Sequence, residues 1–103
     1  MKNISKLMKQ AQQMQSKITV LQNELEIREV EAQSGGGVVK VKVNGKQEIV
    51  EIKINPECID SNDPEMLEEL IKTAVNQAVK QSNEMVSSAM SKVTGGLKIP
   101  GLF

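Results

Sequence analysis

The stretch Val39–Ile54, VKVKVNGKQEIVEIKI, decides the fold. Its first half alternates valine with lysine, and its second half alternates valine or isoleucine with charged residues. Alternation at period two is typical of strands with one buried face. Between the halves, Asn44-Gly45 is a pair favoured at the two central positions of a type I′ turn. The stretch therefore predicts a β-hairpin.

The expected turn sets the register of this hairpin. With Asn44 and Gly45 as the loop, Val39 lies opposite Val50, and the valine and isoleucine set shares one face of the sheet. The residues expected in the core are Val39, Val41, Val50 and Ile52.

A long helix is expected before the hairpin. Its apolar positions recur at steps of three and four, the spacing of a narrow coiled-coil-like seam: Ile4, Leu7, Ala11, Met14, Ile18, Leu21 and Leu25. The pattern predicts a helix to about residue 26. Residues 28–33 then alternate at period two and predict a short edge strand, followed by a loose turn at Ser34–Gly37.

A second long helix is expected after the hairpin. Asp63 is a favoured N-cap residue and Pro64 a favoured first helical residue. An apolar face recurs over about thirty residues, and Gly95-Gly96 is expected to end the helix. This face contains Leu67, Leu70, Ile71, Ala74, Ala78, Met85, Ala89 and Val93.

These elements predict an α+β fold of order α-β-β-β-α. Two helices of this length must overhang a three-stranded antiparallel sheet of short strands, so we expect them to form an antiparallel arm. The N-terminus of the first and the C-terminus of the second should lie at the far end. Open strand edges and half-covered apolar surface predict a homodimer.

Length and composition restrict the function classes. The 103 residues predict one domain, 1–103, with a flexible C-terminal tail at about 95–103. The chain has no His, Trp or Tyr and one cysteine, Cys58, which we interpret as a packing residue. We therefore expect no enzymatic activity, catalytic residue, metal, cofactor or small-molecule substrate. Apolar residues never run beyond two in a row, so we expect a soluble, cytoplasmic protein without a membrane partner.

Three short patterns could indicate ligand sites, and each has a simpler interpretation. The Gly35–Gly37 run lacks the Gly-Lys-Ser/Thr of a phosphate loop and is better explained as a turn. Asp60-Ser61-Asn62 begins like a calcium loop but lacks its later ligands. The acidic pairs Glu29/Glu31 and Glu68/Glu69 are expected to form a solvated acidic face.

Charge is balanced overall but unevenly distributed. The 13 basic and 13 acidic residues give a net charge of zero. Residues 1–20 contain lysines and no acid, whereas the acids gather near the expected sheet. On the expected fold this gives a basic arm tip and an acidic base.

The chain resembles the YbaB/EbfC family of small bacterial nucleoid-associated DNA-binding proteins. The similarity begins at Leu7–Gln15, LMKQAQQMQ, continues through Ser34–Val41, SGGGVVKV, and includes the Pro100–Phe103 ending, PGLF. It implies a homodimer whose sheets join, whose helices project like the arms of tweezers, and which binds double-stranded DNA and influences nucleoid organisation or gene expression. The chain lacks the glycine-rich N-terminal lead common in that family.

The lysines of the arm are the expected phosphate contacts. These candidate DNA-binding residues are Lys2, Lys6, Lys9, Lys92 and Lys98. Lysine contacts phosphate as a point charge and the only arginine is Arg28, so we expect binding that tolerates sequence. A second hypothesis stays open: the helix-hairpin-helix order is also that of prefoldin-like chaperone arms, which hold protein partners through apolar contacts.

Overall fold

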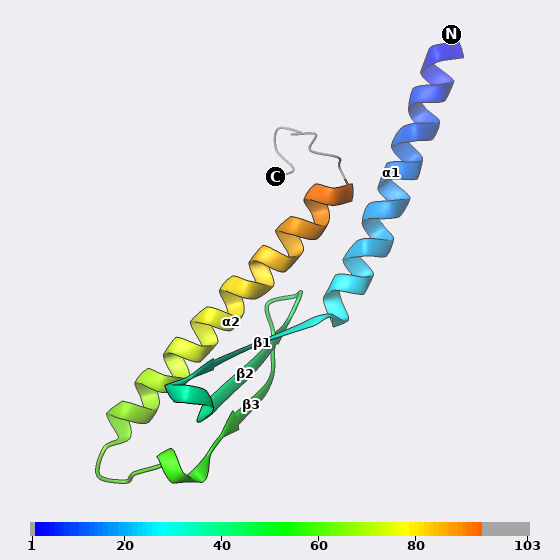
Figure 1. Cartoon of the computed structure of the whole chain (residues 1–103). Coiled ribbons are helices and arrows are strands. Elements are labelled where there is room, and N and C mark those ends of the chain that lie inside the picture. Colours follow the sequence, from blue (N-terminus) through cyan, green and yellow to red (C-terminus); the bar gives the residue numbers. More distant parts are fainter. Residues whose placement is uncertain (1, 94–103) are drawn as a thin grey trace.

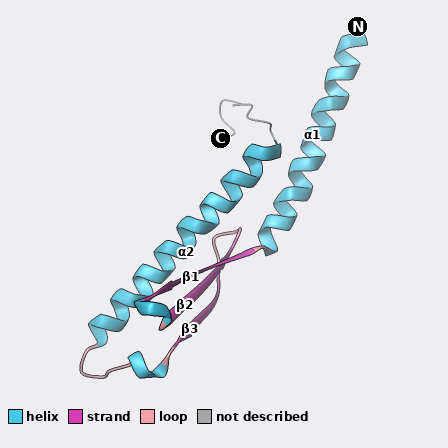
Figure 2. Cartoon of the chain, viewed as in Figure 1, coloured by secondary structure: helices cyan, strands magenta, loops and turns pink. Residues whose placement is uncertain are grey.

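The structure, a computed structural model, describes residues 2–93 and, at Lys2, the backbone alone. It confirms the order α-β-β-β-α (Figures 1 and 2). The elements are α1 (Lys2–Ile27), β1 (Glu29–Ser34), β2 (Val39–Asn44), β3 (Ile49–Ile54) and α2 (Pro64–Val93), with short 3-10 turns at Gly35–Gly37 and Pro56–Cys58.

The molecule is elongated because both helices extend beyond the sheet. Its principal extents are 74 × 22 × 17 Å and its radius of gyration is 19.7 Å, against about 13 Å for a compact chain of this length. Helix α2 packs along the sheet for its first half and then projects past it (Figure 1). Helix α1 projects in the same direction and reaches farther than α2 (Figure 1).

The core lies between α2 and two of the three strands. The antiparallel sheet has the order β1-β2-β3, so β1 is an edge strand as predicted. Alternate residues of β2 face α2, where alanines allow close approach of the helix. The buried set is Ala32, Val39, Val41, Val43, Ala74 and Ala78, with Cys58 packed at its margin as expected.

The predicted two-residue turn is wrong. The amide of Asn44 donates to the carbonyl of Glu48 at 3.0 Å, and the amide of Gln47 donates to the carbonyl of Asn44 at 3.1 Å. Within this loop, the residue with a positive φ is Gln47, at 68°, rather than Asn44 or Gly45. The side-chain oxygen of Asn44 accepts from the amides of Lys46 and Glu48, which stabilises this longer loop.

The longer loop changes the register and the core. Val39 pairs with Ile54 and Val41 with Ile52, and a bulge follows at Lys42/Val43. Val50 and Ile52 were expected in the core, and this is wrong: they are 46% and 42% exposed. The reason is that α2 covers β1 and β2, whereas β3 forms the opposite edge of the sheet beyond the helix.

A side chain caps the start of α2. The predicted N-cap is confirmed, since a carboxylate oxygen of Asp63 accepts from the amide of Met66 at 3.3 Å.

The glycine turn after β1, expected to be loose, packs against the first half of α2: the hydroxyl of Ser34 donates to the carbonyl of Leu70 at 2.6 Å. The predicted stop at Gly95-Gly96 and the tail at 95–103 lie outside the described residues.

Neither α1 nor α2 is apolar enough along its described length to cross a membrane.

The buried valines of β2 give a direct test of the core. Val41 is fully buried between strands and helix, so Val41→Asp places an unpaired carboxylate in the core and should lower the free energy of unfolding by at least about 3 kcal/mol. Thermal melting followed by circular dichroism measures this. The matched control is Lys40→Asp on the exposed face of the same strand. Equal melting of the two variants would show that β2 faces the other way.

Candidate nucleic-acid interface

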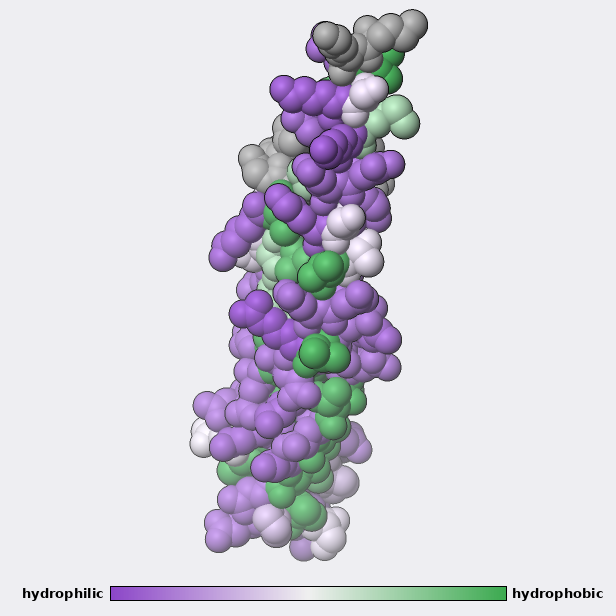
Figure 3. Space-filling model, turned by 90° about the vertical axis from the view of Figure 1, so that its right-hand side faces the viewer, coloured by the Kyte–Doolittle hydropathy of each residue, from purple (hydrophilic) through white to green (hydrophobic). Residues whose placement is uncertain are grey.

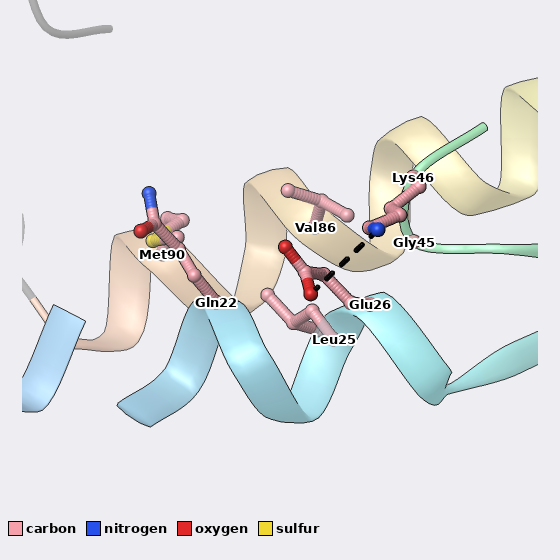
Figure 4. A pocket seen from close by; sticks show the side chains of 7 residues that line it. All are labelled: Gln22, Leu25, Glu26, Gly45, Lys46, Val86 and Met90. Carbon is pink, nitrogen blue, oxygen red and sulfur yellow. Dashed lines mark ion pairs between the residues drawn. The ribbon is translucent and has the colours of Figure 1, made fainter. Parts of the chain in front are cut away.

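The direction of α1 is set where its last turn meets the hairpin loop. The carbonyl oxygen of Leu25 accepts from two amides, that of Arg28 at 3.2 Å and that of Gly45 at 3.1 Å. Leu25 itself is buried, and Figure 4 shows it beside Gly45 and Val86. A Cβ at position 45 would overlap the Leu25 carbonyl, so only glycine permits this approach.

The same loop is also held by α2. The buried hydroxyl of Ser82 donates to the carbonyl of Asn44 at 2.7 Å and accepts from the side-chain amide of Gln47 at 2.8 Å. An ion pair between Lys46 and Glu26 of α1, 4.0 Å apart, closes the other side (Figure 4). The loop thus joins the last turn of α1 to the middle of α2.

The two helices pair over only part of the arm. Leu21 and Leu25 of α1 line shared hollows with Met85, Val86 and Met90 of α2. Because α2 is described to Val93, the N-terminal half of α1 extends beyond this pairing (Figure 1).

Lys6 and Lys9 lie exposed on the N-terminal half of α1. At 3.6 residues per turn they lie on the far side of the helix from the Ile4–Leu7 seam. Lys9 lines a polar surface with Gln12, Gln13, Ser16 and Lys17. Lys17, two turns from Lys9, is therefore a further cation of this surface that the candidate set left out.

Lys92 lies elsewhere on the arm. It is exposed in the last turn of α2 and lines a hollow with Leu21 and Arg28. Leu21 is twelve residues from Lys9, roughly 18 Å along the helix axis. The described chain therefore places Lys92 beside the C-terminal part of α1, away from Lys6 and Lys9. Lys98 and the side chain of Lys2 lie outside the described residues.

Arg28 is a further cation of the arm that the candidate set left out. In sequence it stands between acidic residues, Glu26 and Glu29. In the structure it lines the same hollow as Lys92, a residue far away in the chain. To predict that Arg28 and Lys92 lie close together, one would have to know which turns of α1 and α2 pack against each other.

The ion pairs lie toward the sheet end of the molecule. The ion pairs found among residues 2–93 are Lys46–Glu26, Lys53–Glu51 and Lys72–Glu69. All three lie in or next to the sheet, the hairpin loop and the first part of α2. Lys6, Lys9 and Lys92 take part in none of these pairs, so their ammonium groups can contact phosphates without breaking an ion pair found here.

The fold, together with a first helix that carries lysines and no acid up to residue 20, defines a small α-β-β-β-α protein with a basic arm. Residues 1–97 match the YbaB/EbfC DNA-binding family, and the chain belongs to that family.

Relatives that match almost the whole chain are named nucleoid-associated proteins. A nucleoid-associated protein of Thermoanaerobacter pseudethanolicus is 54% identical over 101 residues, which are 98% of this chain and 91% of that protein. A nucleoid-associated protein of Desulforamulus reducens is 56% identical over 98% of this chain and 96% of its own. The crystal structure of an uncharacterized Helicobacter pylori protein has the same fold, with a TM-score of 0.75 at 24% identity, covering 88% of this chain and 96% of that one.

Gly45→Ala tests how the arm is positioned. The added methyl group overlaps the Leu25 carbonyl, so the loop must move and release α1. We expect unfolding to become easier by more than about 2 kcal/mol, or the arm to change direction. Thermal melting and small-angle X-ray scattering measure the two effects. Lys46→Ala, next to it on an exposed position, is the control: it removes only the long, solvent-exposed ion pair with Glu26, so it should change the free energy of unfolding by less than about 1 kcal/mol and leave the scattering curve unchanged. A Gly45→Ala variant with the parent's melting temperature and scattering curve would contradict this role.

Proposed function

We propose that this protein is a non-enzymatic nucleoid-associated protein that binds double-stranded DNA as a homodimer. The observation that carries the proposal is the part of α1 up to residue 20, which presents Lys6, Lys9 and Lys17 on exposed positions and contains no acid. Membership of a DNA-binding family and relatives named nucleoid-associated proteins support it. On this proposal the protein acts at the nucleoid, on DNA organisation or gene expression.

The contacts are proposed to go to the DNA backbone. Lysine carries a compact charge on a flexible stem and lacks the fork of donors with which arginine reads guanine. The glutamines beside Lys9 could add contacts to base edges, but the charged groups of this surface are lysines. Binding should therefore tolerate sequence, and excess unrelated DNA should displace a labelled duplex.

The proposed dimer joins the β3 edges of two copies. The other edge, β1, carries Glu29 and Glu31, and charged edges resist pairing. The charges of β3 differ because Glu51 and Lys53 are of opposite sign and pair with each other at 3.5 Å. Strand β3 is unpaired on its outer side, and its apolar residues Ile49, Val50 and Ile52 are exposed in a single chain. A second copy would cover them by symmetric pairing and place two arms on one assembly.

Ile52→Glu tests this interface. Ile52 is 42% exposed in the single chain and lies outside the buried core, so a charge there should leave the subunit folded and separate the dimer. Sedimentation equilibrium should give a dimer for the parent and a single chain of 11.3 kDa for the variant. Gln33→Glu on the β1 edge is the matched control and should remain dimeric. A parent protein that sediments as a single chain at micromolar concentration would contradict the proposed dimer.

A second candidate function is a protein-binding arm. It is favoured by the exposure of Ile4, Leu7 and Met8 near the end of α1. Salt distinguishes the two: phosphate contacts weaken as salt rises, whereas apolar contacts persist.

The lysines of α1 give the decisive variant. If about six lysines of a dimer meet phosphates, the logarithm of affinity should fall against the logarithm of salt concentration with a slope of roughly −5. Replacing Lys6 and Lys9 together with Ala removes about four contacts per dimer and should flatten the slope by roughly three to four units. Gel-shift titrations at several salt concentrations measure this.

Two controls accompany the double variant. Lys40→Ala on the exposed face of the sheet should affect binding less, and Lys92→Glu should weaken it less than Lys6→Glu, because Lys92 lies beside Leu21 and away from Lys6 and Lys9. If the double variant keeps the parent's affinity and salt slope, the arm does not grip DNA, and the sheet face with Lys40, Lys42 and Lys53 becomes the site to test.

A further inference from the structure

The N-terminal half of α1 carries an uncovered apolar strip. Ile4, Leu7 and Met8 are 60%, 62% and 59% exposed, respectively. Ile4 and Leu7 continue the seam that is half-buried at Ile18 and Leu21, where α2 lies against it. One stripe of the helix is thus covered in its C-terminal half and bare in its N-terminal half. Figure 3 shows hydrophobic patches on a mainly hydrophilic arm.

The chain that follows α2 begins beside the point where this cover ends. Val93 lines the same hollow as Leu21, and the sequence continues TGGLKIPGLF. This segment contains four large apolar residues and no acid, listed in order as Leu97, Ile99, Leu102 and Phe103. We propose that residues 97–103 dock on the bare strip of α1 in the same chain and extend the cover that α2 begins.

The segment is long enough to do so. Leu21 and Leu7 are fourteen residues apart, roughly 21 Å along the helix axis. The nine residues from Val93 to Leu102 span up to roughly 30 Å when extended. Leu102 therefore reaches Leu7 even if the glycine pair at 95–96 makes a turn.

The charges of α1 are compatible with this occupant. Lys6 and Lys9 lie about 150° around the helix from the centre of the strip formed by Ile4, Leu7 and Met8, so a segment on the strip buries neither of them. The docked segment would also carry Lys98 to the basic half of α1. The contact itself does not depend on DNA binding, and its test is made without DNA.

Disulfide trapping in the full chain tests the proposal. In a Cys58→Ala background, Leu7→Cys is combined with Leu102→Cys and oxidised under mild conditions. The matched control combines Ser5→Cys with Leu102→Cys, because Ser5 is exposed on the opposite side of α1 from Leu7. A third variant carries Leu7→Cys alone. Circular dichroism melting verifies that all three fold like the parent.

The expected result is a disulfide within one chain that forms several-fold faster in the Leu7 variant than in the Ser5 variant, at low and at high salt. Non-reducing electrophoresis distinguishes it from a link between chains. Equal rates for Leu7 and Ser5, or no disulfide in either, would overturn the proposal. A dimeric product of the third variant, or between position 7 of one chain and position 102 of another, would show that a second copy covers the strip.

Discussion

The arrangement of the arm depends on a carbonyl group at the end of α1. The Leu25 carbonyl accepts from the amides of Arg28 and Gly45, and there is no room for a side chain between Gly45 and this carbonyl. The loop that supplies Gly45 is held from the other side by the hydroxyl of Ser82. One short loop therefore holds two helices that are far apart in the chain. The direction of the basic helix α1 depends on these contacts.

This anchoring explains how so small a core holds so long a molecule. The buried residues are small or β-branched side chains between α2 and two strands, whereas much of α1 lies outside that core. Fixing one end of a helix firmly lets the other end present charge far from the acidic sheet end. Toward that end, Lys46, Lys53 and Lys72 each pair with an acid, whereas Lys6, Lys9 and Lys17 of α1 take part in none of these ion pairs.

Much of the fold could be predicted from local pattern. Three features depend only on residues that are close together in the sequence: the three-and-four spacing of α1, the alternation of β2 and the Asp63-Pro64 start of α2. The structure confirms all three. The turn was mispredicted because the side chain of Asn44 caps a longer loop, with Gln47 in the left-handed region. The exposure of Val50 and Ile52 depends on which strands α2 covers. The alternating pattern of β3 shows that one face is apolar, but it does not show whether α2 covers that face.

The candidate site was partly predictable for the same reason. Lys6 and Lys9 could be placed because they lie within one helix, whereas the nearness of Arg28 to Lys92 depends on where two helices meet. The most direct test is an NMR titration of the isotope-labelled full chain with a short duplex. The account predicts that the largest amide shift changes fall in residues 3–17 of α1, with smaller changes near Arg28 and Lys92. Changes concentrated on β2 and β3 around Lys40, Lys42 and Lys53, with α1 unaffected, would contradict it.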